Sequence, residues 1–284
     1  MRVAVVGAKG QLGGAIVEWF RGAHDVIPLT RADADITSDA AVAATMARVR
    51  PEVIINCAAF NDVDGAEDRP VDALNVNAFS VRSLARAAVA ADAIFVHYST
   101  DFVFDGTASA PYMEDVRPNP RSVYAASKLL GEWFAADAPR SYVLRVESLF
   151  GTARGGSPAK GTVEAIRKML TSGQTPRVFE DRTVSPTYVP DAARATAHLI
   201  EIRAPYGLYH CVNSGHCTWL EFARDLAHQM GVEPRLEAIR LADLQLRASR
   251  PAFCALSNDK LAATGFTMPD WRDALRRYID AGRV

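Results

Sequence analysis

The feature that most constrains this chain is a glycine-rich turn directly after its first apolar run. Residues 2–6 are apolar apart from Arg2, and Gly7, Gly10 and Gly13 follow with a spacing of three. Glycine lets a backbone turn sharply into a helix and approach a phosphate closely, and the amides at the helix N-terminus favour an anion. Because the spacing stands between a strand pattern and a helix pattern, it predicts a dinucleotide-binding βαβ unit rather than a tight turn alone.

Apolar runs alternate with amphipathic stretches through the first half of the 284-residue chain. This alternation predicts an α/β protein with a doubly wound parallel sheet, the Rossmann arrangement. Predicted strands cover residues 2–6, 25–29, 53–57, 94–98 and 142–145, and predicted helices cover about 12–21, 39–48, 76–91 and 123–136. We expect the dinucleotide-binding domain to occupy residues 1–150.

The composition changes after this domain. Gly, Ser and Pro gather at residues 151–158, which predicts a loop, and the later elements are shorter and less regular. Residues 151–284 are therefore expected to form mainly a smaller substrate-binding lobe. Near 177–212, the strand-like runs at 177–180 and 207–212 can return to the main sheet, so one cut need not divide the domains.

Composition and charge narrow the class of partner. The chain has 32 basic and 33 acidic residues, for a formal net charge of −1, whereas nucleic-acid binders usually carry a basic excess. No apolar run approaches the roughly 18 residues needed to cross a bilayer, and the N-terminus lacks the layout of a signal peptide. We expect a cytoplasmic protein with a small-molecule ligand and no nucleic-acid or membrane partner. A homodimer is expected because it is the commonest oligomer.

Cysteine and histidine spacing gives little sign of a metal site. Cys57 and Cys254 stand alone, and the nearest metal-like cluster is His210-Cys211 with His216-Cys217. Alternate residues of a strand face opposite ways, and structural zinc motifs have tighter spacing. The cysteines also form no Cys-x-x-Cys pair and are too sparse for a disulfide framework. We expect structural thiols and no metal.

The end of the second predicted strand bears on the choice of dinucleotide. Sites that prefer NAD usually place Asp or Glu there to bind the ribose 2′-hydroxyl. Here the residues are Leu29, Thr30 and Arg31, with no carboxylate and with a guanidinium that can pair with a 2′-phosphate. The pattern predicts NADPH, and NADH is the alternative if Arg31 is an ordinary surface arginine.

Two residues four apart point to acid–base chemistry. Tyr124 and Lys128 share one face of a predicted helix, where the ammonium would lower the pKa of the phenol and make it a general acid or base. A packed tyrosine beside a surface lysine is the alternative for an isolated pair. The segment 98–106 favours catalysis, because it leaves the fourth predicted strand at the edge where ligands bind. It carries Thr100, which can hydrogen-bond the oxygen that Tyr124 protonates.

Together these segments resemble the extended short-chain dehydrogenase/reductases, and most closely the dTDP-4-dehydrorhamnose reductases. The resemblance covers nearly the whole chain. It is carried by residues 7–13, Asp35-Ile36, residues 56–67, Val76-Asn77, Ser99-Thr100-Asp101, Tyr124 with Lys128, Ser185-Pro186-Thr187 and Arg250-Pro251. It implies that Thr100, Tyr124 and Lys128 form a catalytic triad.

The resemblance also implies a cofactor site. The residues expected to bind the dinucleotide, besides Tyr124 and Lys128, are Gly7, Gly10, Gln11, Leu12, Gly13, Arg31, Asp35, Ile36, Cys57, Ala58, Ala59, Asn77 and Ser99. Some have structural alternatives, because Ala58 and Ala59 can be packing residues and Asn77 can cap a helix. A substrate role and a solvated loop position are equally open for three nearby carboxylates, namely Asp62, Asp64 and Glu67.

The substrate side departs from the family pattern. In the sugar-nucleotide dehydratases a proton-abstracting glutamate follows the Thr-Asp pair, whereas Phe102 stands here and cannot transfer a proton, which disfavours elimination. The reductases usually carry a tryptophan after the fifth strand, whereas this chain has Glu147-Ser148, so its sugar contact must differ. Arg182 is open between a substrate diphosphate and a neighbouring carboxylate. The residues expected on the substrate side are Asp101, Phe102, Glu147, Ser148, Arg182 and Arg250.

These patterns predict NADPH-dependent reduction of a 4-keto-6-deoxy nucleotide-sugar in deoxysugar biosynthesis. NADPH would deliver the hydride, Tyr124 the proton, and Lys128 would hold the nicotinamide ribose. One alternative is a non-catalytic NADP-binding regulatory subunit, because the regulatory subunit of methionine adenosyltransferase resembles the same branch. Another is a nucleotide-sugar epimerase or a different sugar-nucleotide reductase.

Overall fold

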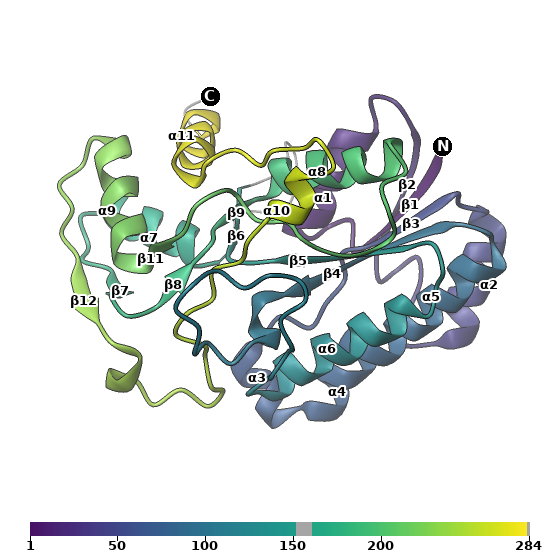
Figure 1. The fold of residues 1–284 in the computed structure, drawn as a ribbon, viewed down its shortest axis with the longest axis horizontal. Helices are drawn as coiled ribbons and strands as arrows, with labels where there is room; N and C mark the ends of the chain where they lie inside the picture. The colour runs from purple at the N-terminus through teal and green to yellow at the C-terminus, as the bar shows by residue number, and fades with distance from the viewer. Residues whose placement is uncertain (152–160, 283–284) are drawn as a thin grey trace.

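The computed structural model describes residues 1–151 and 161–282, and at its centre lies a six-stranded sheet (Figure 1). All of its strands are parallel, in the order β10-β5-β4-β3-β1-β2. They are β1 (Arg2–Val6), β2 (Asp25–Leu29), β3 (Val53–Asn56), β4 (Ile94–Thr100), β5 (Ser141–Val146) and β10 (Gly207–His210). Parallel sheets are buried on both faces, so their strands read as continuous apolar runs. The predicted α/β fold is confirmed.

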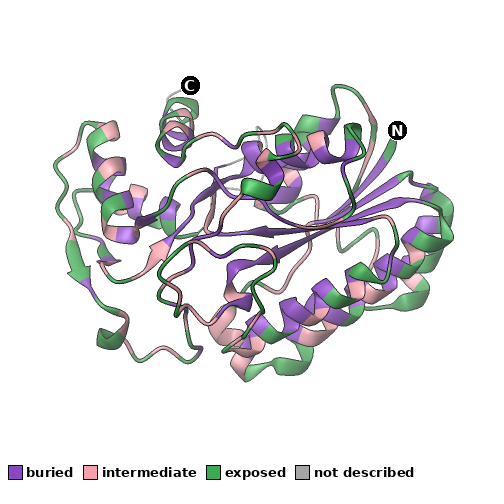
Figure 2. Ribbon diagram, in the orientation of Figure 1, coloured by how far each residue is buried: buried purple, intermediate pink, exposed green. Residues whose placement is uncertain are grey.

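Helices cover both faces of this sheet. On one face α1 (Gln11–Phe20) packs beside α8 (Val189–Glu201), and on the other lie α2 (Asp39–Val49), α5 (Ser80–Ala90) and α6 (Val123–Ala136). Figure 2 shows that the buried residues of these helices face the sheet. The two layers leave the carboxyl ends of the strands free at one edge.

Local capping explains where two of these helices begin. The Ser38 hydroxyl accepts a hydrogen bond from Ala41 N at the start of α2, and the Ser122 hydroxyl accepts one from Ala125 N at the start of α6. The predicted helix at 76–91 is instead a five-residue π-helix, Asn75–Phe79, followed by α5. Sequence periodicity also missed the short helices α3 (Val63–Asp68) and α4 (Pro70–Leu74) before it.

A second core lies beyond the sheet. The helices α7 (Thr162–Thr171), α9 (Trp219–Met230) and α11 (Trp271–Ala281) surround it, and the rings of Phe222 and Trp271 stack with centroids 5.4 Å apart. Three two-stranded sheets border it, namely β6 (Leu149–Phe150) with β9 (Thr187–Tyr188), β8 (Thr183–Val184) with β11 (Cys217–Thr218), and β7 (Arg177–Phe179) with β12 (Glu237–Ile239). The short helix α10 (Asp259–Ala262) lies beside β10.

The two strand-like runs near 177–212 have different positions. β10 pairs with β5 at the edge of the main sheet, whereas β7 pairs with β12 away from it. A domain division near residue 150 stays a prediction. The loop predicted at 151–158 lies, apart from Gly151, outside the described residues.

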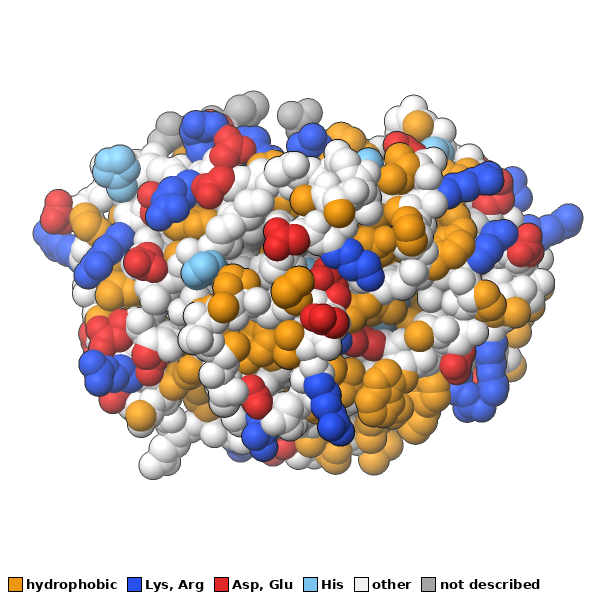
Figure 3. Space-filling view, in the orientation of Figure 1, with side chains coloured by type: hydrophobic (Ala, Val, Ile, Leu, Met, Phe, Trp, Pro, Cys, Tyr) orange, Lys and Arg blue, Asp and Glu red, His pale blue; other side chains and the backbone are white. Residues whose placement is uncertain are grey.

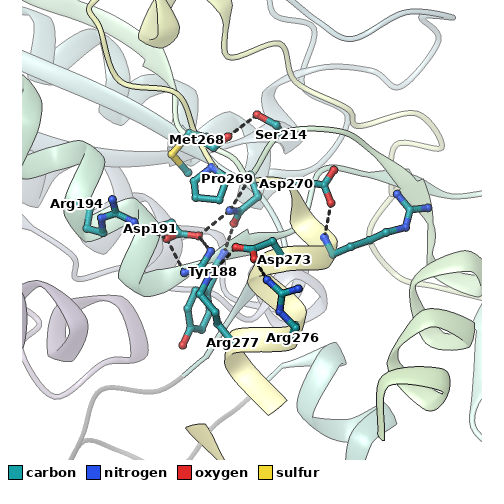
Figure 4. A network of polar contacts seen from close by, with 12 residues as sticks. Tyr188, Asp191, Arg194, Ser214, Met268, Pro269, Asp270, Asp273, Arg276 and Arg277 are labelled. Atoms are coloured by element: carbon teal, nitrogen blue, oxygen red, sulfur yellow. Dashed lines mark hydrogen bonds and ion pairs between the residues drawn. The ribbon is translucent and has the colours of Figure 1, made fainter. Parts of the chain in front are cut away.

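A buried ion pair joins the sheet helix α8 to the terminal helix α11 (Figure 4). Both nitrogens of the Arg277 fork donate to Asp191, at 2.9 and 2.7 Å, and Asn213 Nδ2 donates to the same carboxylate at 2.8 Å. The Asp191 side chain is fully buried, and the Arg277 guanidinium also lies 5.1 Å from the centre of the Tyr188 ring. These contacts fix the second core against the sheet.

Acidic and basic side chains are interspersed on the face shown in Figure 3, without an extended area of one sign. Within the described ranges, the helices all fall short of the length and apolar character that a membrane span requires.

Candidate active site

The glycine turn after β1 has a backbone that only glycine can form. Gly7 has a φ of +79°, and a Cβ at this position would lie 2.7 Å from Ala58 N. A Cβ on Gly13 would lie 2.3 Å from Gly7 O, so the helix packs directly on the turn. Gly10 is the N-cap of α1, where no side chain caps the helix and the first turn has no acidic residue. The helix N-terminus is therefore available to an anion.

A pocket of about 440 Å³ extends from this turn along the ends of β1, β2 and β3. Most of the residues expected to bind the adenosine half of a dinucleotide line it: Gly7, Gly10, Arg31, Asp35, Ile36, Cys57, Ala58 and Ala59. Its walls combine small and apolar side chains with an exposed polar rim. This matches the shape and chemistry of a site for a nucleoside.

Two carboxylates are engaged with the loop after β2, one on the polar rim (Asp35) and one beside it (Asp33). Asp33 accepts hydrogen bonds from Thr30 N and Oγ1, at 2.8 and 2.7 Å, and Asp35 accepts them from Thr37 N and Oγ1, at 3.0 and 2.7 Å. These hydrogen bonds lower the pKa of both carboxyl groups. Arg31 is exposed on the pocket wall and takes part in none of the ion pairs found among the described residues. Its guanidinium is thus accessible to a phosphate.

A second pocket, of about 390 Å³, continues the groove toward the centre of the sheet edge. It shares Gly10 and residues 57–59 with the first pocket. The predicted residues on its wall also include Gln11, Leu12, Ser99, Thr100, Asp101, Phe102, Tyr124, Lys128, Ser148 and Arg182. The groove therefore brings the glycine turn and the predicted catalytic residues into one site.

Tyr124 lies in the first turn of α6, and its phenol hydrogen-bonds the Thr100 side chain. Burial raises the pKa of Tyr124, and the Thr100 contact opposes this only in part. The prediction that Lys128 lowers this pKa is wrong for the structure, because burial of the phenol outweighs its polar contacts and Lys128 is not among the groups that shift it. The Lys128 ammonium donates to Tyr98 O at 2.6 Å. The phenol is consequently protonated at neutral pH, as a proton donor must be.

Lys128 is 3% exposed, and burial lowers its pKa to about 8. Below it on the same helix, Glu132 forms a two-pronged buried ion pair with Arg145 of β5, at 2.8 and 2.7 Å, and accepts a hydrogen bond from Ser99 Oγ at 2.6 Å. The Ser99 hydroxyl, expected at the cofactor, is therefore committed to Glu132. This pair fixes the register of α6 on the sheet, and with it the positions of Tyr124 and Lys128.

Asn77 lies apart from both pockets and is fully buried. Its Oδ1 accepts a hydrogen bond from Phe60 N at 2.8 Å, and its Nδ2 donates to Ser127 Oγ at 3.0 Å. Ser127 Oγ in turn donates to Tyr124 O. Asn77 thus joins the segment after β3 to the helix α6, and its expected role at the cofactor stays a prediction.

The predicted substrate residues separate into two groups. Asp101 and Arg182 line the groove, and Glu147 lies beside them below its wall, each carboxylate being 2% exposed. The Arg182 guanidinium lies 5.1 Å from the centre of the Phe102 ring and 3.8 Å from Cys254 Sγ. Burial raises the pKa of both carboxyl groups, while the guanidinium acts against this rise. The contacts seen for Arg182 are therefore the Cys254 sulfur and the Phe102 ring, and its charge acts on both carboxyl groups without a direct ion pair.

Arg250 belongs to the second group. Its guanidinium donates to both oxygens of Asp64, at 2.9 and 2.6 Å, and to Ala248 O at 3.0 Å, and it lines neither pocket. A diphosphate could bind there only after this pair had broken. The neighbouring acids are also structural, because Asp62 caps α3 and Glu67 accepts a hydrogen bond from Val123 N at the start of α6.

Ser148 has a φ of +46°, in the left-handed region, and lines the second pocket. The reductase pattern places a tryptophan after the fifth strand. Here the aromatic residue on this wall comes from elsewhere in the chain, because Trp219 at the start of α9 lines the same pocket. Thr162 and Val163 of α7 complete that wall. Sequence reasoning missed these three residues, since only the folded chain brings α7 and α9 to the sheet edge.

The metal-like residues are arranged differently from the sequence pattern. The His210 ring bonds Ser257 O through Nδ1 and contacts Arg145 through Nε2, so both nitrogens are engaged. The described part of the chain contains one group of three ligand-type side chains, Asp101, Glu147 and Cys254, whose atoms lie within 4.8 Å of one another. All four cysteines are free thiols.

Comparison with known proteins agrees with this geometry. The whole chain, residues 1–284, matches the model of a family described as the RmlD substrate binding domain. A spore coat polysaccharide biosynthesis protein, SpsK of Bacillus subtilis (strain 168), is 33% identical over 280 residues, which cover 98% of this chain and 96% of that protein.

Two solved structures are similar over their full length. A dTDP-4-dehydrorhamnose reductase from Clostridium acetobutylicum is 32% identical with a TM-score of 0.94, and the match covers 100% of both chains. A dTDP-4-dehydrorhamnose reductase from Bacillus anthracis, solved in complex with NADP, is 31% identical with a TM-score of 0.93 and 99% coverage of both. The predicted resemblance is confirmed, and the chain belongs to the RmlD substrate binding domain family.

Proposed function

We propose that this chain is an NADPH-dependent reductase of the keto group of a dTDP-4-dehydro-6-deoxy sugar. The observation that carries the proposal is the meeting of Thr100, Tyr124 and Lys128 in the groove that begins at the glycine turn. The relatives named dTDP-4-dehydrorhamnose reductase, at identities of 32% and 34%, support the reaction. The Bacillus anthracis relative, whose structure holds NADP, supports the cofactor.

The residues of the groove fit this cofactor. Without a Cβ, Gly7 lets the turn pack directly on the backbone of Ala58, and the uncapped N-terminus of α1 offers its amides to a pyrophosphate. Ile36 and Ala58 offer apolar contact for an adenine, and Arg31 can pair with a 2′-phosphate. When bound, NADPH supplies the hydride that the reduction requires.

The chain's own residues supply the proton and position the reacting oxygen. We assign Tyr124 as the general acid, because its phenol is protonated and lies on the groove wall. Thr100 hydrogen-bonds the same phenol and can orient the keto oxygen toward it. Lys128 lies four residues along α6 and is assigned to the ribose of the nicotinamide. Phe102 stands where elimination would need a base, so reduction is favoured.

The sugar is proposed to contact the wall made by Ser148, Trp219 and α7. Serine replaces a large apolar surface with a hydroxyl, and Trp219 supplies an aromatic surface from the other side. This wall differs from the usual reductase pattern, so we propose that it sets which 4-keto sugar is preferred. A homodimer and a cytoplasmic location are further proposals, which sedimentation and cell fractionation would test.

The deciding experiment measures NADPH oxidation with dTDP-4-dehydro-6-deoxy-L-mannose, generated in place from dTDP-glucose. The wild type should turn over, and Tyr124→Phe should lower kcat by about 10²- to 10⁴-fold, the usual contribution of a general acid. NADPH should still bind the variant, as measured by fluorescence titration, because the phenol oxygen contributes one contact among many.

A control variant tests whether the loss is specific to the phenol. Tyr112→Phe removes a hydroxyl that contacts the loop around Gly106 outside both pockets, and it should leave kcat within about twofold. Substantial activity in Tyr124→Phe would contradict the assignment of the acid. Absence of turnover by the wild type with any nucleotide-sugar would favour the regulatory subunit over the reductase.

A further inference from the structure

Two buried carboxyl groups follow neighbouring strands at the floor of the groove. Thr100 of β4 pairs with Val146 of β5, so the next residues, Asp101 and Glu147, emerge side by side. Each is 2% exposed, and one oxygen of each lies within 4.8 Å of the other and of Cys254 Sγ. The strand register alone therefore forces two acids together in a site that excludes water.

The hydrogen bonds of these acids satisfy only half of their oxygens. Asp101 Oδ1 accepts from Thr100 Oγ1 at 2.9 Å, and Glu147 Oε2 accepts from Ser185 N at 2.6 Å. Asp101 Oδ2 and Glu147 Oε1 are buried, and no N–H or O–H of a described residue donates to them, so the weakly donating Cys254 thiol is the polar group beside both acids. A buried acceptor without a donor is costly, and a proton on one acid would supply a donor.

The charges around Asp101 and Glu147 also favour a proton on one of the two acids. Within residues 1–151 and 161–282, Arg182 is the cation whose charge acts on both acids, and Cys254, which lies beside them, stays a neutral thiol because burial raises its pKa. Two ionised carboxylates against one guanidinium would leave a net negative charge in a buried site. Burial and the charge of Asp101 raise the pKa of Glu147 well above its ordinary value.

The pair is connected to the proposed general acid. Tyr124 hydrogen-bonds Thr100, and Thr100 donates to Asp101, so the phenol, a hydroxyl and a carboxyl group form one chain. After Tyr124 has given its proton away, the phenolate lies beside the Thr100 side chain, while the Lys128 ammonium donates to Tyr98 O at 2.6 Å. The chain through Thr100 is the contact by which the phenolate can regain a proton within the site.

We propose that Asp101 and Glu147 hold one proton between them and that Asp101 returns it through Thr100 to Tyr124 after each reduction. The inference rests on the proposed function. In the first step the Tyr124 O–H bond breaks as the product hydroxyl forms, leaving a phenolate. Thr100 then gives its proton to the phenolate and takes one from Asp101. The pair regains a proton from solvent through the groove, which Asp101 lines.

A metal ion is the competing occupant of the same cluster. Such an ion would need a thiolate, and it would face the Arg182 guanidinium, which lies 3.8 Å from Cys254 Sγ. A proton removes the excess charge and satisfies an orphaned oxygen without displacing that guanidinium. The structure thus favours the proton, and metal binding becomes an outcome of the test.

The test replaces Glu147 with glutamine, which can still accept from Ser185 N but cannot carry the proton. In the wild type at neutral pH, infrared difference spectroscopy should show the carbonyl band of a protonated carboxylic acid, and Glu147→Gln should lose it. In rapid-mixing experiments the first turnover should change less than about twofold, whereas steady-state kcat should fall about tenfold or more, because only reprotonation is slowed. Asp101→Asn, with the Thr100 contact retained, should give the same infrared and kinetic pattern.

Glu114→Gln is the matched control, because Glu114 also accepts one backbone hydrogen bond, from His210 N at 2.8 Å, but lies outside both pockets. Thermal melts would show that each variant is folded. A wild type without the carboxylic band, or a Glu147→Gln variant that retains it, would overturn the proposal. So would stoichiometric Zn²⁺ binding by the wild type that Glu147→Gln abolishes. The infrared result needs no substrate, so it stands even where the proposed reductase activity fails.

Discussion

The two ends of the groove recognise charge in opposite ways. At the nucleotide end, Arg31 and Asp35 lie in water, and the anion site is made by backbone amides at the start of α1. At the catalytic end, Lys128, Asp101 and Glu147 are buried, and burial shifts the pKa of each. Exposed groups keep their ordinary charges and suit binding, whereas buried groups respond strongly to a neighbour and suit proton transfer.

The difference predicts that charges near the catalytic end cost far more to remove. Arg145→Met should lower the free energy of unfolding by about 3–5 kcal/mol, because it leaves the Glu132 carboxylate buried without its partner. The control lies just before the same strand. Arg140 pairs with the exposed Asp92, so Arg140→Met should cost no more than about 1 kcal/mol. Denaturant unfolding of both variants measures the difference, and equal losses would remove the distinction between buried and exposed charges.

The same contrast explains how much the sequence could predict. At the nucleotide end the site comes from short contiguous motifs, residues 7–13 and 57–59, whose glycines and small residues carry the signal directly. Five of the six main strands also follow from periodicity, whereas the sixth, β10, was left open. Motif spacing likewise indicates Thr100, Tyr124 and Lys128, the residues proposed to be catalytic.

At the catalytic end, the sequence predicts which residues belong to the site but not how they are arranged. Asp101, Glu147 and Arg182 were expected on the substrate side, but Cys254 lies 72 residues from Arg182, and no local pattern shows that they meet. Arg250 pairs with Asp64, which lies 186 residues away in the sequence. The guanidinium that was expected to bind a diphosphate is therefore engaged with a loop carboxylate. The prediction that Lys128 lowers the pKa of Tyr124 was wrong for a similar reason, since helical spacing gives proximity to Lys128 but no measure of burial.

A substitution in the glycine turn should weaken cofactor binding at the nucleotide end of the groove. Gly7→Ala should weaken NADPH binding by at least about tenfold, because the Cβ would lie 2.7 Å from Ala58 N at a φ of +79°. Gly22→Ala is the control, since nothing lies within 4 Å of its Cβ and the change should be neutral or slightly stabilising. Fluorescence titration with NADPH measures the effect. Unchanged affinity in Gly7→Ala would mean that the turn does not hold the pyrophosphate.

The smallest effect is expected for the exposed cation at the nucleotide end. Arg31→Ala should raise the KM for NADPH by about tenfold, or about 1.4 kcal/mol, because one solvated guanidinium–phosphate contact is lost. The KM for NADH should not change, since NADH lacks the 2′-phosphate, and this makes NADH the internal control. High salt should weaken the wild-type preference for NADPH, because exposed charges are screened. An equal rise for both cofactors would show that Arg31 supports the loop rather than reading the phosphate, and the choice between NADPH and NADH would then have to lie with Asp35 and the turn around it.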